Sequence, residues 1–176
     1  MTTASVLSAF PAARGRDAVA LVFDYMAATQ AETGRPAPAD IAELPAVLQR
    51  ECGSLQDVYR PPGVFLIADL GSQPAGCVGL AALPGGLIAE ARRLYVRPAH
   101  RSNGIARTLM SHAHDHAARH GMTKVILDVL PARAAVISFY RRLGYTETDP
   151  FETESPVPMI YMERAVTMSD IHMNRP

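Results

Sequence analysis

A short polar segment at residues 101–106 connects an apolar, strand-like run that includes Val96 to a helix-like run that begins at Ile105. The first backbone N–H groups of a helix have no acceptor within the helix, and they lie at the positive end of its dipole. A turn in this position can therefore hold an anionic group, typically a phosphate. Gly104 would let such a group approach the backbone closely.

A carboxylate, Glu90, lies in the middle of the strand expected over residues 87–96. Burying a carboxylate is costly unless it has a partner, and a positioned carboxylate can act as a general base. Two interpretations follow: a salt bridge with Arg92 or another neighbour, or a proton acceptor in catalysis. Strict alternation would place Ile88, Glu90, Arg92, Leu94 and Val96 on one face of the strand, and Ala89, Ala91, Arg93 and Tyr95 on the other.

Tyr140 lies on a helix expected over residues 132–143. A phenol with its ordinary pKa of about 10 can protonate a departing thiolate within hydrogen-bond reach. The alternative is a tyrosine that covers the core and keeps its hydroxyl in water. Cys77 is the weaker candidate for a nucleophile, because its apolar neighbours would raise the pKa of the thiol.

Three histidines, His112, His116 and His120, recur at helical spacing and share one face of the helix expected over residues 104–119. Imidazoles in this arrangement could in principle bind zinc. No cluster of Cys, Asp or Glu elsewhere in the sequence supplies the remaining ligands. We therefore predict no metal site, and a hydrated or packing face instead.

Neither the Walker phosphate loop nor the dinucleotide-binding fingerprint occurs at residues 101–106. The spacing Arg-x-x-Gly-x-Ala, formed by Arg101, Gly104 and Ala106, resembles the Gln/Arg-x-x-Gly-x-Gly/Ala loop that binds the pyrophosphate of acyl-coenzyme A in the GCN5-related N-acetyltransferase (GNAT) superfamily. Residues 90–98 and 139–145 follow the order and spacing of that superfamily. The resemblance extends over roughly residues 60–165.

The resemblance implies that acetyl-coenzyme A is the co-substrate. Glu90 would act as the general base, and Tyr140 would lie near the coenzyme sulfur and protonate the thiolate. Family members separate the strand before the turn from the strand after the next helix, so that the pantetheine arm binds between them. The residues expected to bind the coenzyme are Leu94, Tyr95, Val96, Arg101, Ser102, Asn103, Gly104, Ile105, Ala106, Arg107 and Tyr140.

Two positions depart from the superfamily pattern. Many relatives have an asparagine seven residues before the tyrosine, where this chain has Arg133. An arginine there would approach the phosphates of the coenzyme or face water. Ser102 stands where many relatives have glycine, so that its hydroxyl must point away from the pyrophosphate or bond to it.

Apolar periodicity predicts helices over residues 17–32, 104–119 and 132–143, and a further helix from Pro38 to about Leu48, in which Pro45 fits only near the first turn or at a kink. Strands are expected over residues 5–8, 64–68, 75–81, 87–96, 124–130, 145–148 and 159–164. The helix between the fourth and fifth strands predicts a parallel βαβ unit. The expected fold class is α+β: an acyl-CoA N-acyltransferase (GNAT-like) fold with a mixed, mostly antiparallel sheet flanked by helices.

The composition bounds the remaining expectations. A chain of 176 residues fits one GNAT-like domain over residues 1–166 and a C-terminal tail, residues 167–176, that is loosely held or used in a homodimer contact. Lysine plus arginine balances aspartate plus glutamate at 17 each, which predicts no nucleic-acid or membrane partner. Two cysteines are too few for a disulfide framework, so a reducing cytoplasm is expected.

The sequence thus predicts an N-acetyltransferase that moves an acetyl group from acetyl-coenzyme A to a primary amine by direct transfer. A non-catalytic acyl-coenzyme-A-binding regulatory module is the alternative, and a covalent mechanism through Cys77 is a third option. The acceptor stays open among small amines, amino acids, antibiotics and peptide or protein amines. Residues around Phe23, Tyr25 and Leu48 would wall the acceptor pocket or belong to the core.

Overall fold

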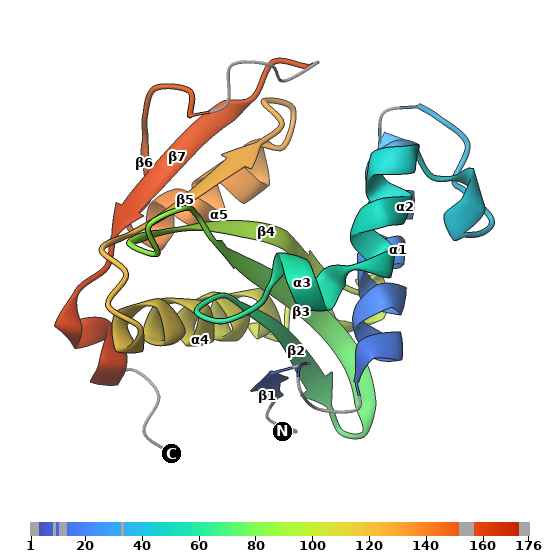
Figure 1. Ribbon diagram of the computed structural model, residues 1–176. Coiled ribbons are helices and arrows are strands. Elements are labelled where there is room, and N and C mark those ends of the chain that lie inside the picture. The colour runs from blue at the N-terminus through green and yellow to red at the C-terminus, as the bar shows by residue number, and fades with distance from the viewer. Residues whose placement is uncertain (1–3, 9, 11–13, 33, 152–156, 173–176) are drawn as a thin grey trace.

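The computed structural model describes residues 4–8, 10, 14–32, 34–151 and 157–172. Within them, one sheet has the strand order β1-β2-β3-β4-β5-β7-β6 (Figure 1). Neighbouring strands are antiparallel except β4 and β5, which are parallel, so the predicted mixed sheet with a parallel βαβ centre is confirmed. The strands are β1 (Ser5–Ser8), β2 (Val64–Leu70), β3 (Gln73–Ala82), β4 (Ile88–Val96), β5 (Lys124–Val129), β6 (Thr146–Glu147) and β7 (Ile160–Ala165).

Helices cover both faces of the sheet (Figure 1). On one face lie α1 (Gly15–Glu32), α2 (Ala46–Gly53) and α3 (Leu55–Val58); on the other lie α4 (Ile105–Arg119) and α5 (Ala134–Arg142). Three short 3₁₀ helices complete the described elements: η1 (Ile41–Glu43), η2 (Pro98–His100) and η3 (Met168–His172).

Alternation along the central strands divides the apolar residues between two cores. In β2, Leu66 and Ala68 face the α4 side, whereas Phe65 and Ile67 face the α1 side. This is the two-residue period of a strand that is covered on both faces. The predicted apolar stripe of α4 is buried in the first of these cores: Ile105, Leu109, Ala113 and Ala117.

The second predicted helix is not continuous. Residues 41–43 form η1, whose start is capped by the Asp40 carboxylate as it accepts a hydrogen bond of 2.8 Å from the Ala42 N–H. Pro45 then occupies the N-cap of α2, where the absence of an N–H costs nothing. The loop predicted after α2 contains a further helical turn, α3.

The C-terminal segment is attached to the domain. η3 packs against α4, and Asp170, which is buried, accepts a hydrogen bond of 2.7 Å from Arg164. Residues 173–176 of the predicted tail lie outside the described residues. Among the described helices, none is both long and apolar enough to cross a bilayer.

A buried polar pair joins α4 to Tyr145, three residues beyond the end of α5. His114 is 4% exposed, and its Nε2 lies 2.8 Å from the Tyr145 hydroxyl. Burial lowers the pKa of His114 to about 4, with a further lowering from Arg164 and an opposing effect of Asp170. The folded protein therefore holds this imidazole in its neutral form at neutral pH.

We expect this histidine to weaken the fold in acid. An unfolded chain binds a proton at an imidazole below its ordinary pKa of about 6.5, so between roughly pH 6.5 and 4 the unfolded state carries more protons and the free energy of unfolding falls as the pH falls. His114→Gln should remove this contribution, up to about 3 kcal/mol, in urea unfolding curves measured between pH 7 and pH 4. His120→Gln, at an exposed site, should keep the wild-type pH dependence; the same dependence in His114→Gln would contradict the assignment.

The ring of Tyr59 lies where a side chain at position 79 would be, because a Cβ on Gly79 would be 2.2 Å from Tyr59 Cε1. Gly79→Ala should therefore destabilise the fold by about 1–3 kcal/mol, each kcal/mol lowering the melting temperature by roughly 2–4 °C. Gly53→Ala is the matched control, since no described atom lies within 4 Å of a Cβ at that position. Equal melting temperatures for the two variants would show that the packing of the Tyr59 ring does not require a glycine at position 79.

Candidate active site

The two parallel strands separate after a short paired stretch. Pairing joins Ile88–Glu90 to Lys124–Ile126, whereas β4 continues to Val96 and β5 to Val129. Among the described residues, no further β4–β5 pair follows, while each strand stays paired on its other edge, with β3 and β7 respectively. The separation that the resemblance implied is therefore present. Backbone groups on the inner edge of β4 face the gap, where a ligand can bond to them.

A β-bulge at Arg93 changes which residues share a face of β4. Cys77 pairs with Tyr95 but Gly79 pairs with Arg92, and Arg93 has a positive φ of 57°. The bulge places an extra residue on β4 and reverses the alternation beyond it. The predicted common face of Glu90, Arg92, Leu94 and Val96 is therefore wrong: Leu94 and Val96 pack on the same core as Ala89 and Ala91, and Tyr95 packs on the α1 side.

A cleft of about 1640 Å³ opens where the strands separate. It is lined by residues of β4, the turn before α4, the end of β5 and the following loop, together with parts of α1, α2 and α5. The sequence-predicted residues that line it are Glu90, Leu94, Tyr95, Val96, Arg101, Ser102, Gly104, Ile105, Ala106, Arg107 and Tyr140. Asn103 is not among the lining residues; its side-chain amide donates to the backbone carbonyls of His100 and Arg101 and so braces the turn.

The turn exposes the start of α4 to this cleft. Gly104 is the N-cap residue, with a φ of 75°, and within the described chain no side chain caps the helix. Ser102 also has a positive φ, 65°, while Arg101 Nε donates to the Val96 carbonyl at 3.1 Å. The first N–H groups of a 15-residue helix therefore point out of the turn without a protein acceptor from a side chain. This arrangement fits a phosphate group.

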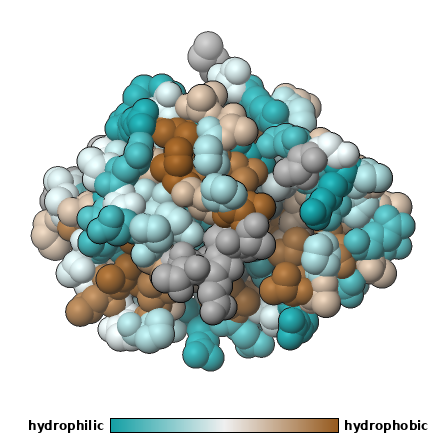
Figure 2. Space-filling view, turned by 90° about the horizontal axis from the view of Figure 1, so that it is seen from above, coloured by the Kyte–Doolittle hydropathy of each residue, from teal (hydrophilic) through white to brown (hydrophobic). Residues whose placement is uncertain are grey.

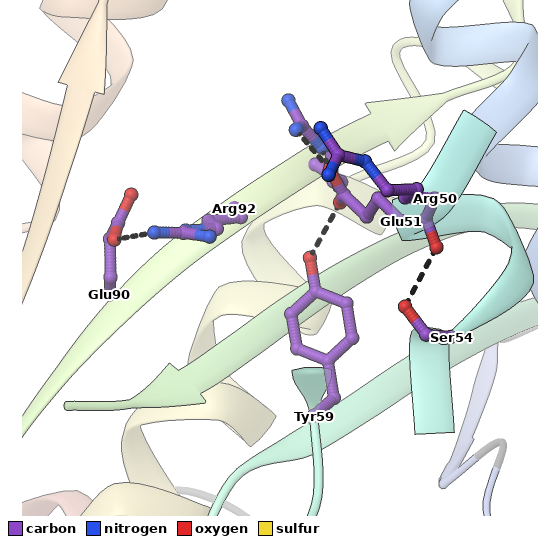
Figure 3. A network of polar contacts seen from close by, with 7 residues as sticks. Arg50, Glu51, Ser54, Tyr59, Glu90 and Arg92 are labelled. Atoms are coloured by element: carbon purple, nitrogen blue, oxygen red, sulfur yellow. Dashed lines mark hydrogen bonds and ion pairs between the residues drawn. The ribbon is translucent and has the colours of Figure 1, made fainter. Parts of the chain in front are cut away.

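Glu90 is buried, with 8% of its surface exposed, and forms an ion pair with Arg92 (Figure 3). Of the two interpretations given to Glu90, the salt bridge with Arg92 is confirmed. Glu90 also lines the cleft, so its carboxylate lies where an acceptor could reach it. Its role as a base stays a prediction.

A second charged pair on this wall, formed by Glu51 and Arg93, was missed from sequence; Tyr59, from outside the cleft lining, also bonds to Glu51. Glu51, on α2, accepts hydrogen bonds from Arg93 Nε at 2.8 Å and Nη2 at 2.5 Å, and one from the Tyr59 hydroxyl at 3.4 Å (Figure 3). The Arg93 guanidinium also lies 5.6 Å from the centroid of the Tyr25 ring. Two consecutive arginines in a central strand were the available signal, because each needs a partner when the strand is covered.

Tyr140, on α5, is 6% exposed and lines the cleft. Burial raises the pKa of its phenol, so the premise of an ordinary phenol is wrong. The hydroxyl consequently stays protonated across the physiological range and can donate a hydrogen bond, while the raised pKa makes it a weaker acid than an ordinary phenol.

Arg133 takes neither of the two orientations considered from sequence. Its Nε donates to Glu32 at 2.7 Å and its Nη2 to Thr29 at 2.9 Å, and its guanidinium lies 5.9 Å from the Tyr25 ring centroid. The side chain thus ties the loop before α5 to the end of α1. These residues all line the cleft, so the contacts of Arg133 connect the α1 side of the cleft to the side of the α5 loop.

The histidine face of α4 is occupied by packing contacts. His116 Nε2 lies 2.8 Å from the Pro62 carbonyl oxygen, and the His116 and His120 rings stack at 4.0 Å. Across the described residues, no group of three or more His, Cys, Asp or Glu side chains is placed to hold a metal ion. Cys77 is fully buried, and burial raises the pKa of its thiol, which disfavours it as a nucleophile.

Comparisons with known proteins agree with this geometry. The model of the Acetyltransferase (GNAT) family matches residues 26–145. The IAA acetyltransferase of Azospirillum brasilense is 30% identical over 111 residues, which cover 62% of this chain and 72% of that protein. The streptothricin acetyltransferase of Streptomyces lavendulae is 44% identical over 50 residues, which cover 28% of this chain and 26% of that protein.

Solved structures share the fold at low sequence identity. A GNAT-family acetyltransferase from Staphylococcus aureus Mu50 superposes with a TM-score of 0.73 at 12% identity, covering 94% of this chain and 100% of that chain. The yncA protein of Salmonella typhimurium, solved with its cofactor acetyl-CoA, has a TM-score of 0.67 at 16% identity, covering 94% and 95%. The chain therefore belongs to the GNAT family of acetyltransferases, which use acetyl-coenzyme A.

Proposed function

We propose that this acetyltransferase transfers the acetyl group directly to a primary amine, with Glu90 as general base and Tyr140 as general acid. The observation that carries the proposal is that a carboxylate and a protonated phenol face one cleft with the uncapped start of α4. A base for an ammonium, a donor for a thiolate and a phosphate site are the three parts that direct transfer to an amine needs.

The coenzyme site is proposed on two backbone features. The N–H groups at residues 102–107, with the guanidinium groups of Arg101 and Arg107 beside them, would hold the pyrophosphate. The inner edge of β4 at residues 94–96, which β5 leaves unpaired, would bond to the pantetheine arm. The thioester would then lie in the gap between the strands, within reach of both catalytic side chains.

The proposed step balances as follows. Glu90 takes one proton from the acceptor ammonium, and the freed amine lone pair forms a bond to the thioester carbonyl carbon. The carbon–sulfur bond breaks, and the thiolate that leaves takes the proton of the Tyr140 hydroxyl. The products are an N-acetyl amide and coenzyme A thiol. Of the second amine proton and the proton on Glu90, one restores the Tyr140 phenol and the other is released to solvent.

The names of two relatives suggest acceptors to try first. The relative from Streptomyces lavendulae is named for streptothricin, and the one from Azospirillum brasilense for IAA. Neither acceptor is assigned to this chain.

We expect coenzyme binding to depend on the charge at position 104. Asparagine and aspartate have the same shape and both tolerate positive φ, and among described residues no atom lies within 4 Å of a Cβ at Gly104. Gly104→Asp should abolish both acetyl-CoA-dependent thermal stabilisation and coenzyme release followed with a thiol reagent, whereas Gly104→Asn should retain most of both. Equal behaviour of the two variants would refute an anion site at this turn.

Replacing either proposed catalytic side chain should lower turnover while sparing coenzyme binding. General acid–base catalysis contributes about 10²–10⁴-fold, so Glu90→Gln and Tyr140→Phe should each reduce kcat by more than about tenfold. Glu147→Gln, at an exposed site, and Tyr145→Phe, buried outside the cleft lining, are the matched controls. A loss below tenfold removes that residue from the mechanism. Stabilisation by acetyl-CoA without amine-dependent release would favour a binding module instead.

A further inference from the structure

Two of the carboxylates that line the cleft, Glu32 and Glu51, are paired with arginines from other elements. Glu32 accepts from Arg133, and Glu51 accepts from Arg93 through both of its oxygens. Glu90 differs, because its partner Arg92 lies two residues away on the same strand and lines the same cleft. The Glu90–Arg92 pair is thus the pair that an acceptor meets beside the proposed thioester position.

The two neighbouring arginines are satisfied to different extents. Arg93 uses its Nε and its Nη2 on one carboxylate. Arg92 reaches Glu90 through Nη2, while its Nε is buried and, among the described residues, has no hydrogen-bond partner. The Arg92 side chain is nevertheless 38% exposed. The Nε and Nη2 groups of an arginine can together donate two hydrogen bonds to one carboxylate. In Arg92 only Nη2 donates to a described acceptor.

An acceptor ammonium that binds Oε2 of Glu90 competes with Arg92 for that oxygen. A half-buried guanidinium that loses its carboxylate is costly, because charged hydrogen-bonding groups removed from water need partners. Glu51 cannot substitute, since Arg93 and Tyr59 already occupy it. A carboxylate on the acceptor would give Arg92 a new partner when the ammonium takes that oxygen.

We propose that the acceptor is an amino carboxylate, whose ammonium binds Glu90 while its carboxylate binds the Nε–Nη2 edge of Arg92. This inference rests on the proposed transfer to an amine. The Glu90 carboxylate and the Arg92 guanidinium are in direct contact, so an ammonium and a carboxylate separated by a few bonds could bind to them side by side. The protein's own ion pair is exchanged for two pairs with the substrate, so that no charge is left uncompensated.

Apolar surface beside these charges fits an apolar remainder of the acceptor. Val47 and Val157 line the cleft and are 61% and 47% exposed. Figure 2, which looks onto the molecule from above, shows apolar residues gathered in patches between polar ones on this face. An amino acid with a hydrophobic side chain is therefore the acceptor to test first.

The test uses amines that differ only in the carboxylate: phenylalanine against phenethylamine, and leucine against 3-methylbutylamine. The wild type should acetylate each amino acid with a kcat/KM at least about tenfold above its decarboxylated counterpart, as expected for hydrogen bonds between charged groups. Arg92→Met should bring the ratio close to one, and Arg92→Lys, which keeps the charge but loses the fork, should give an intermediate ratio. Arg50→Met, which removes a nearby exposed arginine outside the cleft lining, should keep the wild-type ratio (Figure 3).

The ratio within each variant cancels any effect of Arg92 on Glu90 or on folding, since both amines of a pair need the same base. A wild type that uses the plain amines as well as the amino acids, or an Arg92→Met variant that keeps the preference, overturns the amino-carboxylate inference and leaves amine transfer intact. Coenzyme release with neither kind of amine, while acetyl-CoA still raises the melting temperature, overturns amine transfer itself and the inference with it.

Discussion

The clamp between Glu51 and Arg93 fixes the bulge on which the cleft depends. A non-glycine residue with φ near +60° is disfavoured by about 1–2 kcal/mol, and two charge-assisted hydrogen bonds of 2.8 and 2.5 Å offset that strain at Arg93. The extra residue bends β4 while its pairing with β3 continues on both sides of the bulge. The other edge of β4 consequently separates from β5 just after Glu90. The bulge thus accounts both for the gap and for the position of the Glu90 carboxylate at the closed end of the gap.

The half of the cleft that is proposed to hold the coenzyme was predictable because its signals are local. The strand, the turn and the helix follow one another within about twenty residues, and Arg101, Gly104 and Ala106 carry a spacing that few other turns need. The apolar stripe of α4 was equally legible, since its period matches the buried face of a helix. Such features depend on neighbours in sequence, and sequence contains them directly.

The acceptor half was less predictable because it depends on partners far apart along the chain. Glu51 and Arg93 are 42 residues apart, and Thr29 and Arg133 are 104 apart. Neither contact has a periodic signature, so the bulge was missed, the alternation of β4 was extended too far, and Arg133 was assigned to phosphate or water. The ordinary pKa expected for Tyr140 was wrong for a related reason. The burial that raises the pKa of its phenol arises from tertiary packing and not from its own helix.

The ring of Tyr25 connects two of these long-range contacts. One guanidinium, that of Arg93, lies 5.6 Å from its centroid, and another, that of Arg133, lies 5.9 Å from it. The first belongs to the bulge of β4, and the second to the start of the helix that carries Tyr140. Through Tyr25, α1 therefore links β4 to the segment that follows β5, on the two sides of the gap between these strands. A ligand that binds in the gap therefore meets two walls that are linked through one ring, and one of those walls carries Tyr140.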